Sequence, residues 1–449
     1  MGGTEVSIHF DERLPTYVVG SRRADVYAHF RSGLIVRAGR DRSRSYPGLR
    51  GAAPPTHLFY AILCRRSEVS HVLDLGCGSG EGTRQLTTRF ERVTAFDASG
   101  EALAFAREFA PLARYVHTDV CDELPADLAQ GAIVCDVLSQ LPSPELALWK
   151  LRERLENGAE VLVAEPLAGP LQRLAPPARR GYSLRSLAAL VVRGGFSVKE
   201  WITTRGSFVA CIAVPDRSSG ADALVRGLGS IADDDPGAAK LELERAATDG
   251  VPEVCREAHL AVASLGMLAS DGDRAVTALM SAAHSDPSDA RPVAALAEIA
   301  LTVGDNDDAL RLALDAVRLD PTDAAAASAA ARVARAVEHP DTLNVWRIAV
   351  NLAPDDFDLC EGLASLAAER GDAGLGIGTF ERLRGYGDAL DARLHTTLGW
   401  LLLAEGRQAD AEIEAKLARA SAPSDTSVDD LWRALRSSGV AAVRATQND

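Results

Sequence analysis

The pattern of apolar residues changes abruptly near residue 215, and this change constrains the fold more than any other feature of the sequence. Before it, short runs rich in Val, Ile and Leu alternate with segments of helical periodicity. Unbroken apolar runs are typical of strands buried on both faces, and strands that alternate with helices form a parallel, doubly wound sheet. The predicted strands of this α/β domain are 71–76, 92–97, 114–119, 132–138 and 160–166.

Two further predicted strands, 197–204 and 207–214, are separated by a single Arg-Gly pair. A connection this short makes them antiparallel neighbours. The first part of the chain is therefore predicted to contain a seven-stranded sheet whose last strand is antiparallel. Asn157 and Gly158 are predicted to end the helix before the fifth strand, because both residue types tolerate the left-handed backbone at a helix C-terminus.

The second part of the chain has no strand pattern and is predicted to be helical. Residues 216–236 are polar and rich in Gly, which predicts a linker. Residues 237–437 are rich in Ala and Leu, and residues 438–449 are expected to form a tail. Prolines interrupt the helical region at intervals of 34, 33 and 69 residues, the last being two periods: Pro287, Pro321, Pro354 and Pro423.

This periodicity resembles that of the tetratricopeptide repeat (TPR), a helix–turn–helix unit of about 34 residues. The resemblance implies an all-α solenoid of about five units from 256 to 423, capped by a helix at 427–437. The unit at 357–390 fits least well, because it lacks the closing proline and contains the sequence GLGIG. An irregular helical bundle is the alternative. The best unit, 290–321, has small residues where its two helices must approach closely: Ala297, Ala309 and Ala316.

Composition and charge bear on location and partners. No apolar run approaches the roughly 18 residues that span a membrane, and the N-terminus lacks an apolar signal core, so we expect a cytoplasmic protein without a membrane partner. The seven cysteines are scattered and form no CxxC pair, which predicts reduced thiols and no metal site. The net charge of −15 divides into +6 over 1–66, −3 over 67–215 and −18 over 216–449. Such asymmetry indicates binding partners.

The stretch VLDLGCGSGEGT at 72–83 follows the first predicted strand and contains four glycines. A dinucleotide-binding loop requires G-x-G-x-x-G, but Glu81 and Thr83 occupy the two positions where the third glycine would fall. A carboxylate at the start of the following helix would repel a pyrophosphate, and no Gly-Lys-Ser/Thr follows. The loop is therefore predicted to bind a ligand other than a phosphate.

Acidic residues recur near the ends of the first four predicted strands: Asp74, Asp97, Asp119 and Asp136. Ligands of open α/β sheets bind beyond the carboxyl ends of the strands, so these side chains should border one crevice. Such an arrangement suits a cationic ligand rich in hydroxyl and amino donors. S-adenosylmethionine has these groups: a sulfonium, an α-amino group, a ribose diol and an adenine amine.

Together these features resemble the class I S-adenosylmethionine-dependent methyltransferases over roughly residues 55–215. The resemblance implies that Asp74 reaches the methionine amino group directly or through water, and that Asp97 binds both ribose hydroxyls. Asp136 and the two residues after it would face the methyl group and its acceptor. The other implied cofactor-binding residues are three glycines beside the methionine and ribose, and four residues around the adenine: Gly76, Gly78, Gly80, Ala98, Ser99, Asp119 and Val120.

Methyl transfer depends on positioning, and a general base is needed only when the acceptor is protonated at neutral pH. The sequence therefore identifies no catalytic base. Residues 1–66 are expected to form a lid or substrate-binding segment. The weak candidates for a base are His29, His57 and Asp136, with His117, Tyr17, Tyr27 and Tyr46 further behind.

Three functions remain open from the sequence. The first is methylation of an O or N atom of a small-molecule or glycan metabolite in a bacterial biosynthetic pathway, with the repeats serving oligomerisation or partner binding. The second is methylation of a protein or peptide bound by the repeats. The third is a non-catalytic scaffold that retains a cofactor fold. The sequence argues against nucleic acid as a substrate, because the Arg-rich segment 31–44 lacks interleaved aromatic residues for base stacking.

Overall fold

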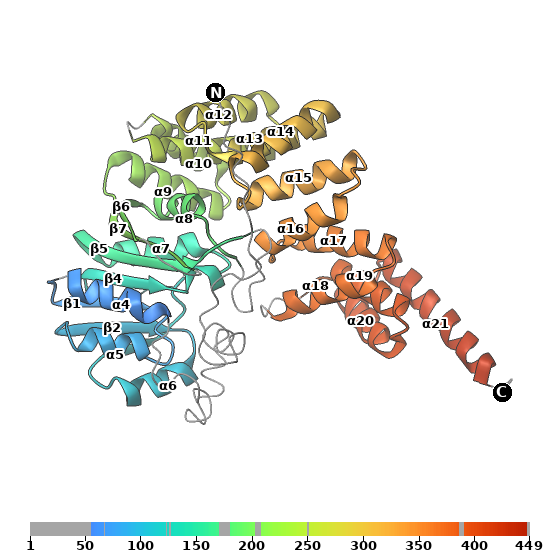
Figure 1. The fold of residues 1–449 in the computed structure, drawn as a ribbon, viewed down its shortest axis with the longest axis horizontal. Coiled ribbons are helices and arrows are strands. Elements are labelled where there is room, and N and C mark those ends of the chain that lie inside the picture. The colour runs from blue at the N-terminus through green and yellow to red at the C-terminus, as the bar shows by residue number, and fades with distance from the viewer. Residues whose placement is uncertain are drawn as a thin grey trace, which may run out of the picture. The chain divides into compact units, whose positions relative to one another are not determined.

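The computed structural model describes residues 55–66, 68–122, 124, 127–169, 180–202, 208–248, 251–385 and 390–446 (Figure 1). The chain divides into two compact units, with the main boundary between Ser288 and Asp289. Four of the candidates for a base lie outside the described residues: Tyr17, Tyr27, His29 and Tyr46.

The first unit contains a seven-stranded sheet in the order β3-β2-β1-β4-β5-β7-β6. The strands from β3 to β5 are parallel, and β7 runs antiparallel between β5 and β6. The predicted seven-stranded sheet with an antiparallel last strand is thus confirmed. The strands are β1 His71–Leu75, β2 Arg92–Asp97, β3 Arg114–His117, β4 Ala129–Cys135, β5 Leu155–Pro166, β6 Phe196–Ile202 and β7 Phe208–Pro215.

Helices cover both faces of this sheet, which explains why its central strands are apolar throughout. Alternate residues along the strands pack on opposite faces, because successive side chains of a strand point in opposite directions. One face carries α4 (Pro55–Arg66), α5 (Glu81–Thr87) and α6 (Gly100–Phe109). The other face carries α7 (Pro144–Glu153) and α8 (Leu184–Arg193).

Helix α4 corrects the expectation that residues 1–66 form a lid. Phe59 and Leu63 are buried in the core against the sheet, and the ring centroid of Phe59 lies 5.6 Å from that of Phe208. Residues 55–66 are therefore part of the packed domain, whereas 1–54 lie outside the described residues.

The prediction that Asn157 and Gly158 end a helix is wrong. Helix α7 already ends at Glu153, and both residues lie within β5. The pairing of β5 with β4 shifts in register there, and Gly158 has a φ of 78°. Gly158 therefore adopts the left-handed backbone at an irregularity within the strand. The same backbone conformation occurs at helix C-termini, so the residue type alone does not distinguish the two.

The prediction of a linker at 216–236 is also wrong, because α9 spans Ser219–Ala232. Its Ala221 and Leu224 are fully buried, and it packs against α10 (Pro236–Ala247). Helices α11 (Pro252–Leu268) and α12 (Gly272–Ser285) follow in the same unit as the sheet.

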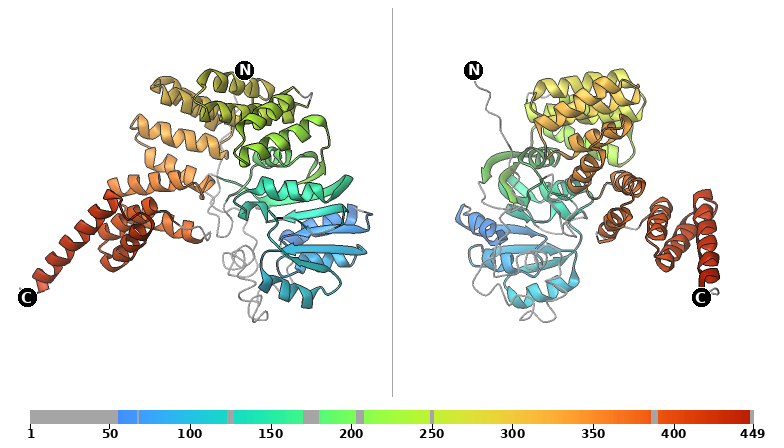
Figure 2. Two further views of the ribbon diagram at one scale, coloured as in Figure 1. Left: turned by 180° about the vertical axis from the view of Figure 1, so that it is seen from behind. Right: turned by 45° about the vertical axis from the view of Figure 1, so that its right-hand side comes forward.

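The second unit is all-helical where it is described, as expected, and Figure 2 shows its helices following one another as antiparallel pairs. The predicted close approach of helices is confirmed in α13 and α14, where Ala297, Ala309 and Ala316 are fully buried. Such an arrangement is consistent with a solenoid. The helices are α13 Ala290–Thr302, α14 Asn306–Leu319, α15 Ala324–Ala336, α16 Thr342–Leu352, α17 Phe357–Glu369, α18 Ala373–Gly385, α19 Ala392–Ala404, α20 Gln408–Ser421 and α21 Thr426–Thr446.

The periodic prolines mark the starts of helices in this unit. Each of Pro287, Pro321 and Pro354 precedes by two residues an aspartate whose side chain accepts a backbone N–H in the first turn of the next helix. The proline prevents the preceding helix from continuing, and the aspartate caps the new one. The GLGIG sequence, which fits a helix poorly on propensity, is nevertheless helical within α18.

Candidate functional site

The glycine-rich loop follows β1 and places three glycines in the left-handed region, with φ values of 67° at Gly76, 53° at Gly78 and 85° at Gly80. A Cβ at Gly76 would lie 2.3 Å from Cγ2 of Val137, and a Cβ at Gly80 would lie 2.9 Å from Ala106. A Cβ at Gly78 would meet nothing within 4 Å. The outer two glycines thus permit close packing of the loop, while Gly78 borders open space in which a ligand can approach the backbone.

Asp97 ends β2 beside this loop. Its Oδ2 accepts the backbone N–H of Gly78 at 2.8 Å, and its Oδ1 accepts the backbone N–H of Ser99, also at 2.8 Å. Each carboxylate oxygen keeps a second lone pair for a ligand hydroxyl. Burial raises the pKa of Asp97, and the two N–H donors oppose this shift. The carboxylate is therefore held in one orientation with both oxygens able to accept further hydrogen bonds.

Asp74 lies within β1 and is completely buried. Its Oδ1 accepts the hydroxyl of Tyr60 at 2.9 Å, and its Oδ2 accepts the hydroxyl of Thr83 at 2.6 Å. Burial raises the pKa of Asp74 to about 7, against the opposing effect of the two hydrogen bonds. Asp74 therefore links α4, β1 and α5 beneath the loop, and its described contacts are with these hydroxyl groups.

The fourth glycine of the motif, Gly82, has a different role from the other three. A Cβ there would lie 2.2 Å from the ring of Tyr60. Gly82→Ala is expected to cost about 1–3 kcal/mol of stability, because the ring must move away from Asp74. Gly229→Ala on α9, where a Cβ meets nothing within 4 Å, should instead add about 0.5–1 kcal/mol. Thermal unfolding of both variants measures the difference, and equal melting temperatures would contradict this packing role.

The predicted adenine-binding residues gather where β2 and β3 end. Ser99 caps α6 by accepting the backbone N–H of Ala102 at 3.1 Å, and the backbone carbonyl of Ala98 lies 2.9 Å from Nε2 of His117. Asp119 is exposed and accepts the backbone N–H of Cys121 at 2.8 Å. Val120 is buried in the core. His117 thus contacts the loop on the adenine side of the predicted site, which argues against its being the base.

Asp136 follows β4 and has a φ of 57°, an unusual value for a residue with a side chain. Its backbone N–H bonds to the carbonyl of Ala164 at 2.8 Å, and its Oδ1 accepts the hydroxyl of Ser139 at 3.3 Å. The next residue, Val137, is the one that a Cβ at Gly76 would strike. The loop after β4 therefore packs directly against the glycine loop.

One functional residue, Glu165, is missed by the sequence analysis. It lies near the end of β5, is completely buried, and accepts three backbone N–H groups. Those of Val137 and Leu138 donate to Oε1 at 3.0 and 2.9 Å, and that of Ser139 donates to Oε2 at 2.9 Å. Burial, followed by the nearby Asp136, raises the pKa of Glu165 to about 8. Glu165 thus holds the loop in which Asp136 lies.

The structure brings most of the predicted residues to one edge of the sheet, where β1, β2, β3 and β4 end in parallel. Gly78 and Asp97 are in direct contact, and Gly76 adjoins the loop of Asp136. His57 lies on α4, but its side chain is outside the described residues. Within the described residues, no group of three His, Cys, Asp or Glu side chains could hold a metal ion. In the same part of the chain, no helix is long and apolar enough to cross a membrane.

This arrangement fits S-adenosylmethionine, whose sulfonium supplies an activated methyl group. The described residues supply the oriented carboxylate of Asp97, an open backbone at Gly78 and a structured loop after β4. These groups bind and orient, and positioning supplies much of the rate in a direct displacement.

Comparisons with known proteins agree with this chemistry. The family described as "Methyltransferase domain" matches residues 72–158. The chain is 46% identical over 61 residues to the trans-aconitate 2-methyltransferase of Paracidovorax citrulli, which covers 13% of this chain and 24% of that protein. It is 34% identical over 102 residues to the protein of the same name from Variovorax paradoxus, which covers 22% and 39% respectively. The chain thus spans less than half the length of these curated relatives.

Among solved structures, the N-methyltransferase NodS from Bradyrhizobium japonicum in complex with S-adenosyl-L-homocysteine aligns with a TM-score of 0.34 and 15% identity, covering 42% of this chain and 100% of that one. The family match includes the glycine loop, Asp97 and the loop of Asp136, which form the candidate site described above. The chain therefore contains an S-adenosylmethionine-dependent methyltransferase domain that includes residues 72–158.

Proposed function

We propose that this protein transfers a methyl group from S-adenosylmethionine to an O or N atom of a small-molecule metabolite. The observation that carries the proposal is the Asp97 carboxylate, fixed by the N–H groups of Gly78 and Ser99 beside open space at Gly78. An intact cofactor site of this kind argues against a non-catalytic scaffold. The names of the two curated relatives support a small organic acid as the acceptor class.

Within this proposal, Asp97 binds the ribose diol, and Asp119 accepts from the adenine amine with Val120 against the ring. Gly76, Gly78 and Gly80 let the backbone pass close to the methionine and ribose. Two residues are proposed for the remaining contacts: Asp74 acts on the methionine amino group through the loop above it, and Asp136 faces the acceptor. No general base is required if the acceptor is a carboxylate, because a carboxylate is already ionised at neutral pH.

We also propose that the helix pairs from α11 to α20 are TPR units that serve self-association or binding of a partner protein, with α21 as the cap. The protein would act in the cytoplasm of a bacterium, within a biosynthetic pathway. If the repeats instead deliver a protein or peptide substrate, the same catalytic domain would methylate that substrate.

The test is methyl transfer by the full-length protein from S-adenosylmethionine with a tritiated methyl group. The acceptors are trans-aconitate and a bacterial extract separated by size into metabolite and protein fractions. We expect label in trans-aconitate or in the metabolite fraction, and much less label with Asp97→Ala at the same cofactor concentration. Label confined to the protein fraction would select the peptide alternative. Calorimetry with no cofactor binding at all would reject the assignment.

A further inference from the structure

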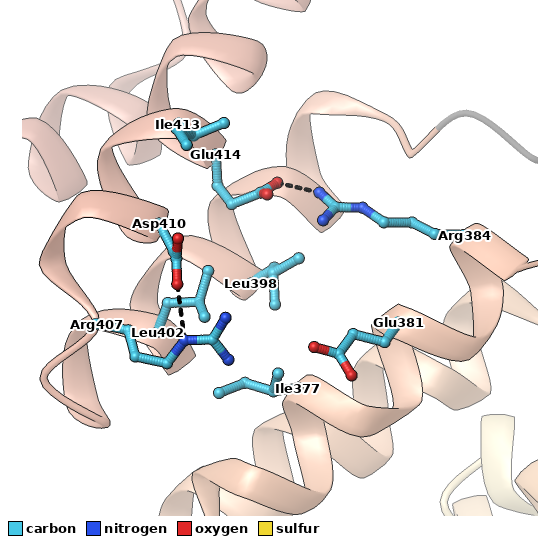
Figure 3. Close-up of a pocket in the computed structure, with 9 residues that line it drawn as sticks. All are labelled: Ile377, Glu381, Arg384, Leu398, Leu402, Arg407, Asp410, Ile413 and Glu414. Atoms are coloured by element: carbon cyan, nitrogen blue, oxygen red, sulfur yellow. Dashed lines mark hydrogen bonds and ion pairs between the residues drawn. The ribbon is translucent and has the colours of Figure 1, made fainter.

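A cavity of about 230 Å³ lies among α18, α19 and α20 of the second unit (Figure 3). Pockets for small-molecule ligands usually enclose about 300–1,000 Å³, so this cavity is of the size that suits a single side chain. It combines apolar walls with charged groups of both signs. The apolar residues are Ile377, Leu398, Leu402 and Ile413, and the charged residues are Glu381, Arg384, Arg407, Asp410 and Glu414.

Both arginines of the cavity already have carboxylate partners. Arg384 forms an ion pair with Glu414, which is 4% exposed and also lies 2.8 Å from Nδ1 of His395. Nε of Arg407 donates to Oδ2 of Asp410 at 2.8 Å. An anionic ligand would therefore have to compete with carboxylates that are in place.

Glu381 is the exception among the charged residues of the cavity. Figure 3 shows its carboxylate directed into the cavity, with no dashed line to any neighbour. Across the part of the chain that the structure describes, it forms no hydrogen bond or ion pair. The lining thus carries three carboxylates against two guanidinium groups, and the excess negative charge lies on the side chain without a partner.

The apolar walls complete the requirements for a long cationic side chain. Arginine and lysine bury their methylene stems on apolar surface while the charged end reaches a polar partner. Residues Asp289–Asp449 carry 27 acidic against 16 basic residues, a net charge of −11, which attracts a basic partner at longer range. On α20, Ile413 and Leu417 are 53% and 42% exposed one turn apart, and they offer apolar contacts beside the cavity.

We propose that the cavity among α18, α19 and α20 binds the arginine or lysine side chain of a separate partner protein. The stem of that side chain lies along Leu398 and Leu402, and its charged end pairs with Glu381. This interaction is independent of methyl transfer, and it makes the second unit a recognition module for a basic segment.

The test uses the full-length protein and the peptide Gly-Ser-Gly-Ser-Arg-Gly-Ser-Gly-Ser, followed by saturation-transfer-difference NMR, which detects weak binding to a large protein. Citrulline, which has nearly the shape of arginine but no charge, replaces the arginine in the matched peptide. We expect the saturation to be concentrated on the arginine methylene protons. The signal of the citrulline peptide should be at least severalfold weaker, and the signal of the arginine peptide should be smaller at physiological salt than at low salt. A lysine peptide should behave like the arginine peptide.

Three variants localise the binding. Glu381→Gln changes an exposed side chain and should weaken binding about fivefold, as for an exposed ion pair of about 1 kcal/mol. Glu405→Gln removes one exposed charge that does not line the cavity and should leave binding within about twofold. Ile413→Arg, at a half-exposed wall position, should place a guanidinium of the protein itself in the cavity and reduce the signal to background.

Equal saturation of the arginine and citrulline peptides would overturn the proposal. Unchanged binding in Ile413→Arg would also overturn it, provided that the melting temperature shows this variant to be folded. A stronger signal from a peptide with glutamate in place of arginine would assign the cavity to an anionic partner instead. Asp97→Ala should bind the arginine peptide as the unaltered protein does, which separates this inference from the proposed methyl transfer.

Discussion

Asp97→Ala is expected to lower the affinity of the protein for S-adenosylmethionine at least about 100-fold, because two hydrogen bonds from a diol to a charged acceptor contribute about 1.5–3 kcal/mol each. The substitution also releases the N–H groups of Gly78 and Ser99, which the carboxylate holds at 2.8 Å. The cofactor loop therefore loses both a ligand contact and an internal restraint. Calorimetric titration of the full-length protein gives the affinity.

The matched control is Asp127→Ala. Asp127 is an exposed residue that pairs with Arg92 where β2 begins, at the opposite edge of the sheet from Asp97. Its loss should leave the cofactor affinity within about twofold, since exposed ion pairs contribute at most about 1 kcal/mol. Asp97→Asn should fall between the two, because it keeps one acceptor oxygen but has no charge. An Asp97→Ala variant that binds the cofactor normally would remove Asp97 from the site.

Glu165→Ala is expected to destabilise the first unit by about 3–5 kcal/mol, because three buried N–H groups lose their acceptor. The corresponding fall in melting temperature is about 10 °C for a domain of this size. Methyl transfer should also fall, since the released loop carries Asp136. Thermal unfolding by circular dichroism and the tritium assay measure the two effects.

Glu165→Gln separates the role of the hydrogen bonds from that of side-chain packing. Its amide oxygen can accept from Val137 and Leu138, but its NH₂ group would face the N–H of Ser139, so about one hydrogen bond is lost. The cost should be about 1–3 kcal/mol. A variant as unstable as Glu165→Ala would mean that packing, rather than hydrogen bonding, makes Glu165 necessary.

The pH dependence of stability gives a further test of Glu165. An unfolded glutamate loses its proton near pH 4.5, whereas native Glu165 keeps it up to a pKa of about 8. The native state therefore binds more protons than the unfolded state between these values, and stability falls as the pH rises through this window. Glu165→Gln has no such proton, so its melting temperature should decrease less steeply over the same window. Parallel curves for the two proteins would contradict the raised pKa.

The sheet could be predicted from the sequence because its strands are buried on both faces, so that each appears as an uninterrupted apolar run. The prediction of a linker at 216–236 is wrong because glycine occurs both in flexible linkers and where two helices pack closely. Gly227 lies inside α9, where a Cβ would come within 2.7 Å of Leu243 on α10. Glycine here permits two helices to approach, but composition alone does not distinguish this use from a flexible linker.

Asp97 could be singled out from local sequence, because it ends an apolar strand and bonds to Ser99 only two residues further on. Glu165 could not be found in this way, since the N–H groups that it accepts lie 26 to 28 residues earlier in the chain. A signal was present nevertheless. An acid at the end of an apolar strand selected Asp97, and the same rule applied to the fifth strand selects Glu165.

The position of the unit boundary has a consequence for how such a chain can vary. Helices α9 to α12 belong to the unit of the sheet, and Glu257 of α11 pairs with Arg193 of α8 at 3.3 Å. Shortening the protein after residue 215 would uncover surfaces that the catalytic unit needs to fold. If the helices after Ser288 stack as repeats, as proposed, helix pairs there could be added, removed or exchanged with mainly their nearest neighbours affected. One enzyme could thereby acquire new binding specificities without any change in its chemistry.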